Sequence, residues 1–595
     1  METPNATRGT RSVGAIATLV ALAAALPFLP TLRASFIYDD TTLLRDNATL
    51  RGWHALTRVW SAPYWPGGGP TVIALYRPFH VALLSAIWNL GGGSPLPFHL
   101  YALALHVVVA VLVWRLLRRG VALAAAAGAA LWFATHALHV EAIASVMNTS
   151  ELLVVACTIA LAMLLAQRST SDRGAARDWL RALGAAALVA AALLSKESGL
   201  LALPVAAITA WGWRAPSETT VDARRFVAEN SRVWLAGIAT IVAVLLARAA
   251  VLGGAASTAS LVAPGMPTEA RARIEVMLSL WPRIAGMLLW PTALSPYYGP
   301  TVLPRHAAIM ATLGIVGALA LVALAAVNAR RGDRRLLVAV GWIALTYFPA
   351  SNLVAASGPF IADRILFPVT VGVALAIGWL LDRAASRARA LLLVVCLALA
   401  ARNAVTTARY ATVWTSHRTL WQSLVTTSPR EYRGYLLLGV DARERGDTAT
   451  EFSMLARAFA MEPRDRRVRF EHGQALYAEG KFAESATVLA PLLRDGDVRR
   501  EPGFVAMYLD AVGRSRGADG VIAAGKPLLR TEAAAPAALY VGAAEELLGR
   551  SAAADSIYEI GLRAAPRDSL LLARRAALRA ASSGGAPKPM TGTRP

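Results

Sequence analysis

The most restrictive feature of this sequence is a series of charge-poor apolar stretches that recurs through its first two thirds. Each stretch is close to, or slightly shorter than, the roughly 20 residues with which an α-helix crosses a bilayer. The series therefore predicts a polytopic membrane protein of about eleven transmembrane helices. The stretches lie at residues 13–32, 97–114, 121–135, 152–166, 182–195, 199–213, 233–247, 307–327, 336–355, 365–381 and 390–401.

The composition agrees with a membrane protein. Of 595 residues, 56% are hydrophobic and only 16% are charged, a balance that a soluble protein of this size could not sustain. Both cysteines, Cys157 and Cys396, fall inside apolar stretches, which argues against a disulfide framework and against a cysteine metal site. The net charge of +22 resides mainly in loop and repeat arginines, so we interpret it as a topology signal and expect no nucleic-acid partner.

Arginine is distributed unequally between the loops on the two sides of the predicted bundle. The loops of one side carry almost nothing basic except Lys196 and Arg364, and the positive-inside rule places the other side, with residues 1–12, in the cytoplasm. The arginines of that cytoplasmic side are Arg115, Arg118, Arg119, Arg168, Arg173, Arg177, Arg181, Arg214, Arg224, Arg225, Arg232, Arg330, Arg331, Arg334, Arg335, Arg383, Arg387 and Arg389.

A different pattern begins at about residue 432, where a helix-turn-helix unit repeats. Gly439 and Gly473 are 34 residues apart, and Gly542 follows Gly473 at about twice that distance, which is the tetratricopeptide period. Such units stack into a solenoid with a concave peptide-binding surface. A generic helical domain is the alternative interpretation.

Together these patterns predict an all-α fold with two main parts, a polytopic transmembrane helical bundle and a C-terminal tetratricopeptide-repeat α-solenoid. An odd number of spans would deliver the repeats to the outer side of the membrane. The expected segments are a cytoplasmic N-terminus at 1–12, a membrane domain at 13–402 with outer loops 33–96 and 253–306, a connecting helix at 403–431, repeats at 432–582 and a disordered tail at 583–595.

An acidic pair, Asp39 and Asp40, directly follows the first apolar stretch, and Tyr76 and Arg77 lie later in the same outer loop. Charged groups retained beside a membrane are candidates for function. Two adjacent carboxylates can divide their tasks, one accepting a proton from a nucleophilic hydroxyl and the other holding a cation or a donor. A pair that caps a helix is the alternative, and the sequence leaves both open.

A second polar cluster contains His136, His139 and Glu141. Imidazoles three residues apart share one helical face, which allows a divalent metal, although the spacing matches no standard zinc motif. Hydrogen bonding to phosphate, to sugar or within the site is the other interpretation. The sequence establishes no cofactor and leaves a divalent metal open.

Two further cations lie at predicted membrane boundaries. Lys196 is suited to neutralise a phosphate, or else it pairs with Glu197 or extends toward water. Arg364 offers a planar guanidinium to a phosphate, or else it pairs with Asp363. The chain contains no phosphate-binding glycine loop, nucleophile elbow or nucleotide fingerprint, so we expect a lipid-borne donor.

At these residues the chain resembles the transmembrane and tetratricopeptide-repeat O-mannosyltransferases and their bacterial relatives, within the C-type glycosyltransferase (GT-C) superfamily. Two positions depart from the family pattern, because Ala137 replaces a common proline and Asp363 replaces a glutamate. The motifs that carry the resemblance follow one another along nearly the whole chain: Tyr38 to Asp40, Tyr76 to Pro78, His136 to Ala142, Ser195 to Gly199, Asn352, Ala362 to Pro368, and Trp414 to Trp421.

The resemblance implies an inverting transfer of mannose or another hexose from a polyprenyl-phosphate carrier to a hydroxyl, typically that of a serine or threonine of an exported protein. It implies that Asp39 or Asp40 is the general base. It also implies a donor site whose residues stabilise the departing phosphate, shape the pocket or support it: Arg77, Lys196, Arg364, His136, His139, Glu141, Tyr76, Glu197 and Asp363.

The expected location is a bacterial inner membrane, with the repeats in the periplasm where they would bind the acceptor. Two alternatives stay open, which are transfer to a lipid or polysaccharide and a non-enzymatic, membrane-anchored scaffold. A transporter fits less well, because the charged groups gather at the outer boundary and not at the middle of the membrane.

Overall fold

The computed structural model describes residues 4–65, 75–167, 175–215, 222–253, 265–356 and 358–582. Across these ranges the regular structure is helical, with one isolated bridge between Tyr298 and Ile361, which confirms the all-α prediction. Arg168, Arg173 and the predicted disordered tail at 583–595 lie outside the described residues.

The chain divides into two compact units, Met1–Ser428 and Pro429–Pro595. Short 3₁₀ segments connect many of the helices of the first unit. These helices are α1 (Pro4–Ala25), α2 (Ala55–Arg58), α3 (Pro78–Gly91), α4 (Pro95–Gly120), α5 (Leu123–Ala134), α6 (Val140–Ala144), α7 (Thr149–Leu165), α8 (Ala175–Leu193), α9 (Ala202–Gly212), α10 (Ala223–Glu229), α11 (Ser231–Leu252), α12 (Ala270–Ser279), α13 (Trp281–Leu289), α14 (Ala307–Arg330), α15 (Arg335–Tyr347), α16 (Asp363–Arg383), α17 (Ser386–Val413) and α18 (His417–Thr427).

Within the described ranges, seven helices are long and apolar enough to cross a membrane, and an eighth span results if α5 and the segment Ala137–Ala144, bent by 47°, count as one. All eleven predicted stretches coincide with helices, which confirms a polytopic bundle. Three of these helices are not counted as spans. With 11 and 13 residues, α9 and α15 are too short to cross a bilayer, and α8 carries three charged residues near its start. Hydropathy alone therefore gives a higher count of spans than the continuous helices do.

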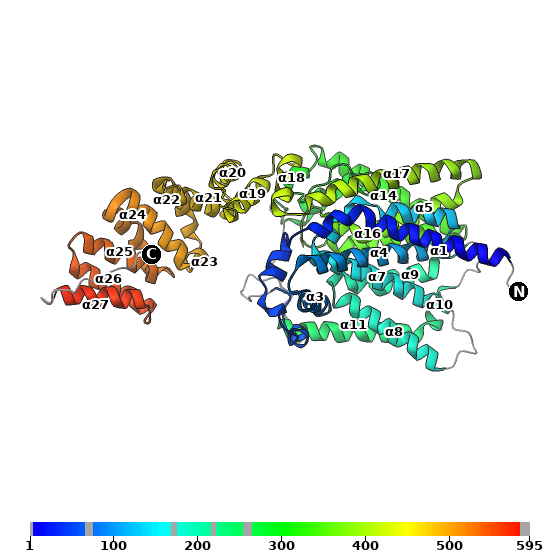
Figure 1. Cartoon of the computed structure of the whole chain (residues 1–595), viewed down its shortest axis with the longest axis horizontal. Helices are drawn as coiled ribbons and strands as arrows, with labels where there is room; N and C mark the ends of the chain where they lie inside the picture. The colour runs from blue at the N-terminus through cyan, green and yellow to red at the C-terminus, as the bar shows by residue number, and fades with distance from the viewer. Residues whose placement is uncertain are drawn as a thin grey trace. The chain divides into compact units, whose positions relative to one another are not determined.

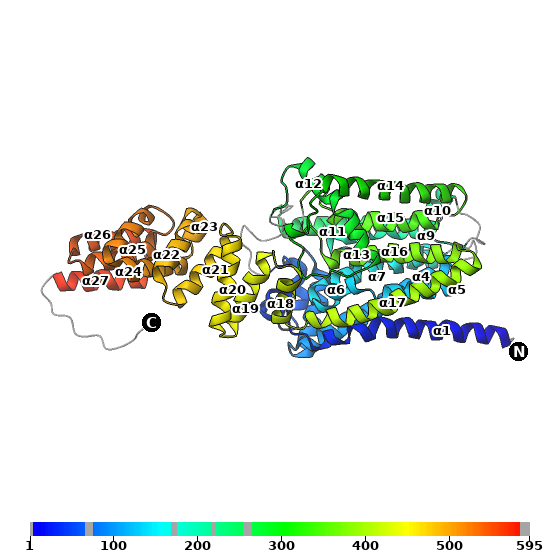
Figure 2. The same ribbon diagram turned by 90° about the horizontal axis from the view of Figure 1, so that it is seen from above.

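The long helices of the first unit run alongside one another, as both views in Figures 1 and 2 show. The apolar parts of α7 and α16 are 72% buried, whereas those of α11 and α14 are 11% buried. The first two therefore form the centre of the unit. Close packing of α15 on α16 depends on Gly372, where an added Cβ would lie 2.7 Å from Ile343 and 2.9 Å from the Ala339 carbonyl oxygen.

The second unit is a run of paired helices, and its glycines explain its period. A Cβ added at Gly439 would lie 2.7 Å from Leu455, one at Gly473 would lie 2.4 Å from Leu489, and one at Gly542 would lie 2.3 Å from Tyr558. Each glycine thus meets a large side chain sixteen positions later, at the crossing of two helices. The helices are α19 (Tyr432–Glu444), α20 (Thr448–Met461), α21 (Arg466–Ala478), α22 (Phe482–Leu489), α23 (Gly496–Arg499), α24 (Pro502–Gly525), α25 (Ala534–Leu547), α26 (Ser551–Ala564) and α27 (Ser569–Ser582).

Candidate functional site

The acidic pair follows a strained residue. Tyr38 has φ of 57°, a left-handed conformation that is unfavourable for a residue with a side chain. Its N–H donates a hydrogen bond to His417 Nε2 at 2.9 Å, and its ring lies 5.7 Å from the ring of Trp421. The segment around α18 therefore holds the first outer loop in this conformation.

Asp40 caps the start of the helical segment that leads into α7. Its carboxylate accepts hydrogen bonds from the Met147 N–H at 2.9 Å, the Val146 N–H at 3.0 Å and the Ser145 hydroxyl at 3.3 Å. Burial raises the pKa of Asp40 to about 7, although the two backbone N–H groups oppose this shift. The helix-capping interpretation thus describes the geometry of this member of the pair.

Asp39 has different surroundings. It is half-buried, and its carboxylate accepts no hydrogen bond from the part of the chain that the structure describes. Burial raises the pKa of Asp39, while the guanidinium groups of Arg364 and Arg77 oppose the increase. The pair therefore separates into a bonded carboxylate, Asp40, and an available one, Asp39.

Three cations near Asp39 form ion pairs with carboxylates from other parts of the chain. The pairing differs from both ion pairs considered from the sequence, because neither Lys196 with Glu197 nor Arg364 with Asp363 is the contact found. The pairs are Arg77 Nη2 with Glu197 Oε2 at 2.6 Å, Lys196 Nζ with Glu151 Oε1 at 2.5 Å, and Arg364 Nη1 with Glu141 Oε1.

Asp363 instead lies in a buried tyrosine cluster. Its carboxylate accepts hydrogen bonds from the Tyr298 hydroxyl at 2.7 Å and the Tyr410 hydroxyl at 3.3 Å. Tyr298 belongs to the loop 253–306 and Tyr410 to α17. Asp363 therefore joins these two segments to the start of α16. Arg364, the next residue, is thereby fixed in place.

The three cations line a cavity of about 740 Å³. Carbon atoms of α7, α9, α15 and α16 form much of its wall, through side chains such as Val155, Val205 and Trp342. Two polar atoms of lining residues, Glu151 Oε2 and Ser198 Oγ, are buried without a hydrogen-bond partner among the described residues. The cavity thus combines a charged region, an apolar wall and two unbonded polar atoms.

Arg273 is a lining residue that the sequence gave no reason to select. Its guanidinium donates to the carbonyl oxygens of Asn352 at 3.0 Å, Val354 at 3.0 Å and Thr268 at 3.2 Å. It therefore ties the segment around Thr268 to residues 352–354 at the wall of the cavity. Because Arg273 lies in a polar helix, α12, no apolar background distinguished it.

The predicted histidines lie elsewhere. His136 and His139 are fully buried and do not line the cavity. His136 Nε2 is 2.9 Å from the Leu288 carbonyl oxygen, and His139 Nε2 is 2.9 Å from Thr370 Oγ1. Both hold helices together in this structure, and no group of three or more potential metal ligands gathers within the described ranges.

Tyr76 also serves packing in this structure, because its hydroxyl donates to the Trp60 carbonyl oxygen at 2.7 Å and so closes the first outer loop. Its neighbour Arg77 turns the other way, toward the cavity, where its guanidinium lies 4.8 Å from the centre of the Tyr64 ring. Of the two, only Arg77 is placed to meet a ligand.

Comparison with known proteins finds similarity to one group of enzymes, although no family model matches the chain. Protein O-mannosyl-transferase TMTC3 of Mus musculus is 25% identical over 391 residues, which cover 61% of this chain and 42% of the relative. Protein O-mannosyl-transferase Tmtc3 of Drosophila melanogaster is 23% identical over 532 residues, covering 78% of this chain and 53% of the relative.

A shorter match has a higher identity, since protein O-mannosyl-transferase Tmtc2 of Drosophila melanogaster is 35% identical over 189 residues, covering 30% of this chain and 20% of the relative. The chain thus spans about half, or less, of the length of these curated relatives. The matches confirm the resemblance drawn from the motifs, because the chain is similar to TMTC protein O-mannosyl-transferases over much of its length.

Proposed function

We propose that this protein transfers a sugar, mannose or another hexose, from a polyprenyl-phosphate donor to a serine or threonine hydroxyl of an exported protein. The names of its relatives support protein O-glycosylation. The observation that carries the proposal is the available carboxylate of Asp39, which lies close enough to the guanidinium groups of Arg364 and Arg77 for them to affect its pKa.

The cavity is suited to a lipid-linked phosphate. Among its described lining residues, the cations Arg77, Lys196, Arg273 and Arg364 outnumber the carboxylates of Glu151 and Glu197. These guanidinium and ammonium groups suit the donor phosphate, and the carbon-rich wall suits the start of the polyprenyl chain. Because the cations are already held by their partners, little reorganisation is needed as negative charge develops on the leaving phosphate.

The two unbonded polar atoms of the cavity fit a sugar. Glu151 Oε2 would accept a hydrogen bond from one sugar hydroxyl, and Ser198 Oγ would bind a second one. A buried polar atom without a partner costs free energy, so a ligand that supplies the missing hydrogen bond gains affinity at these positions.

In the proposed step, the acceptor hydroxyl oxygen attacks the anomeric carbon of the sugar from the face opposite the phosphate. A carbon–oxygen bond to the acceptor forms as the bond to the phosphate oxygen breaks. The bonding electron pair leaves with polyprenyl phosphate, and the hydroxyl proton moves to Asp39. Asp40 positions this base through its bonds to residues 145–147.

The repeats would hold the protein acceptor. Ser35 N–H donates to the Thr415 carbonyl oxygen at 3.1 Å, so the chain leaves the first unit at the end that carries Asp39. We further propose a bacterial inner membrane as the location, with this end of the first unit and the repeats on the periplasmic side.

The test is transfer from a polyprenyl-phosphate mannose to a serine- and threonine-containing peptide by the purified full-length protein, with mass spectrometry of the product. Loss of a general base lowers a rate by about 10²–10⁴-fold, and we expect this loss for Asp39→Asn. For Asp40→Asn we expect a lower unfolding temperature and a smaller loss of rate per folded molecule. A folded Asp39→Asn variant with the rate of the wild type would contradict the assignment of the base.

A further inference from the structure

A second cavity, of about 380 Å³, lies at the other end of the α15–α16 pair. The two helices are antiparallel, because Arg335 at the start of α15 contacts Asp382 near the end of α16 at 2.7 Å. The 13 residues of α15 separate its two ends by roughly 20 Å. This cavity is therefore distinct from the one beside Asp39.

The lining of the second cavity is strongly basic. Its described part contains one carboxylate, that of Asp333, and five arginines. The arginines come from three segments that are far apart in the sequence, namely the end of α9, the turn between α14 and α15, and the end of α16. They are Arg214, Arg331, Arg334, Arg335 and Arg383.

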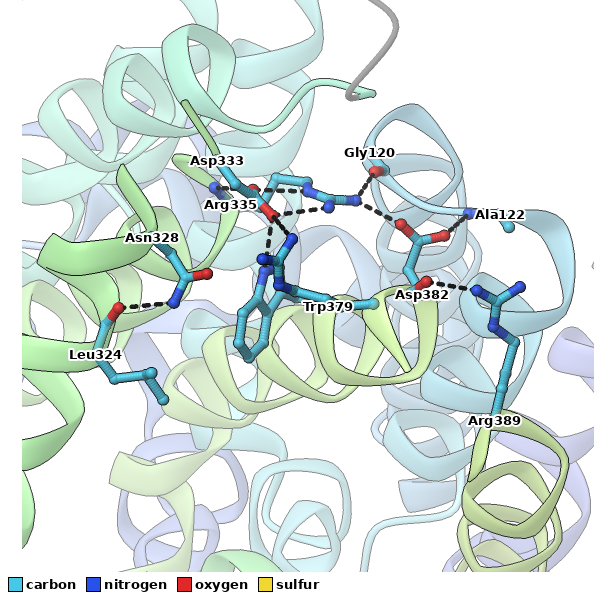
Figure 3. A network of polar contacts seen from close by, with 10 residues as sticks. Gly120, Ala122, Leu324, Asn328, Asp333, Arg335, Trp379, Asp382 and Arg389 are labelled. Atoms are coloured by element: carbon cyan, nitrogen blue, oxygen red, sulfur yellow. Dashed lines mark hydrogen bonds and ion pairs between the residues drawn. The ribbon is translucent and has the colours of Figure 1, made fainter. Parts of the chain in front are cut away.

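Asp333, the one carboxylate among the described lining residues, forms ion pairs with Arg335, as Figure 3 shows, and with Arg383. Arg335 is buried, and its Nε and Nη2 each lie 2.9 Å from an oxygen of Asp333. Its Nη1 donates to Asp382 at 2.7 Å and to the Gly120 carbonyl oxygen at 2.8 Å. Asp333 also accepts a hydrogen bond from Trp379 Nε1 at 3.0 Å, and its Oδ2 lies 4.0 Å from Arg383 Nη1, so this one carboxylate is shared by two of the five lining arginines.

Two glycines shape the wall. A Cβ added at Gly212 would lie 2.6 Å from Val338, so glycine permits the end of α9 to approach α15. Gly332 has φ of +91°, which the tight turn before Asp333 requires. As a result the Arg334 guanidinium lies 4.2 Å from the centre of the Trp211 ring. The arginines are thus placed by the fold.

We propose that this cavity binds the phosphate group of an anionic membrane lipid. Guanidinium groups form paired hydrogen bonds with phosphate oxygens, and basic pockets between membrane helices are suited to anionic headgroups. The cavity opens where membrane-spanning helices end, and Trp211 beside it is a residue type that favours the membrane interface. The proposal is independent of the sugar-transfer activity.

The test is a titration of the detergent-solubilised full-length protein by native mass spectrometry. The probes are phosphatidylglycerol, phosphatidylcholine with the same acyl chains, and sodium diphosphate. The double variant Arg331→Ala/Arg383→Ala removes two lining charges. Arg224→Ala/Arg387→Ala removes two exposed charges outside the lining and is the matched control.

We expect phosphatidylglycerol to bind the wild type more tightly than phosphatidylcholine does. Its affinity should fall roughly thirtyfold in the double variant and little in the control. The variant Arg331→Lys/Arg383→Lys should retain most of the affinity, because it keeps the charge. Equal unfolding temperatures in phosphatidylcholine would show that the variants are folded.

Two results would overturn the proposal. Equal phosphatidylglycerol affinity of wild type and Arg331→Ala/Arg383→Ala would mean that the cavity binds no lipid phosphate. Displacement of phosphatidylglycerol by sodium diphosphate, with the same dependence on the two arginines, would identify a soluble phosphate compound as the ligand and exclude the lipid.

Discussion

The two ends of the α15–α16 pair carry cationic cavities that differ in how charge is balanced. Beside Asp39, each of the three predicted phosphate-binding cations pairs with a carboxylate from another segment, and carbon atoms form much of the wall. At the opposite end, the described lining has five arginines to one carboxylate, whereas the described lining of the first cavity has four cations to two carboxylates. The first arrangement suits a phosphate that must leave after a reaction, and the second suits an anion that stays bound.

The carboxylates at the two ends also differ in their hydrogen bonds. At the basic end, Asp333 and Asp382 both accept hydrogen bonds from Arg335, so neither is free to take a proton. At the other end, Asp39 accepts no hydrogen bond from any described residue. The Asp39 end is therefore the one to which we assign the proposed base and the proposed cavity for the leaving phosphate.

The largest stability effect should come from breaking one ion pair at each end. Glu141→Gln leaves the Arg364 guanidinium without its charged partner, which typically costs about 3–5 kcal/mol for a buried pair. Asp382→Asn should cost less, about 1–3 kcal/mol, because Asp333 still pairs with Arg335. Thermal unfolding in detergent measures both effects.

Sugar transfer per folded molecule then separates the two ends. We expect it to fall for Glu141→Gln, because Arg364 lines the cavity beside Asp39, and to stay at the wild-type level for Asp382→Asn. Equal loss of transfer in both variants would contradict the assignment of the reaction to one end.

A second effect concerns pH and distinguishes the two aspartates. The pKa of Asp40, raised to about 7, exceeds the unfolded value near 3.8, so the folded state binds the extra proton between these values. Stability contributed by this group is therefore present at low pH and is lost as pH rises from about 4 to about 7. Compared with Asp40→Asn, the wild type should lose about 1–4 kcal/mol across this window.

The transfer rate should respond in the opposite direction. A general base must be ionised, and burial raises the pKa of Asp39, so the wild-type rate should increase with pH through that raised pKa. Rates measured at several pH values on protein that stays folded would test this. A rate that declines over the same range would argue against a carboxylate base.

The sequence predicted the all-α bundle well, because hydropathy and helix length depend on local composition. It also selected Arg77, Lys196 and Arg364, which the structure brings into one cavity. The reason is physical, since a cation retained at the boundary of an apolar segment is conspicuous in the sequence. A similar cation in a polar helix, Arg273, was not conspicuous, and it was missed.

Pairing could not be predicted from the sequence. The partners of Lys196 and Arg364 are Glu151 and Glu141, which lie 45 and 223 positions away along the chain. Sequence proximity favoured the adjacent acids instead. The different surroundings of Asp39 and Asp40 could not be predicted either, because they depend on the contact of Asp40 with the segment 145–147.

The smallest effect concerns the glycine that shapes the basic cavity. An alanine at Gly212 would place its Cβ 2.6 Å from Val338 and so push α9 away from α15, at a cost of about 1–3 kcal/mol. Gly317 on α14 is the matched control, because no atom lies within 4 Å of an added Cβ there, and Gly317→Ala should stabilise that helix by up to about 1 kcal/mol. Thermal unfolding measures both changes.

Gly212→Ala should also weaken phosphatidylglycerol binding and leave sugar transfer unchanged. A loss of transfer without a loss of lipid binding would show that the two ends are not independent.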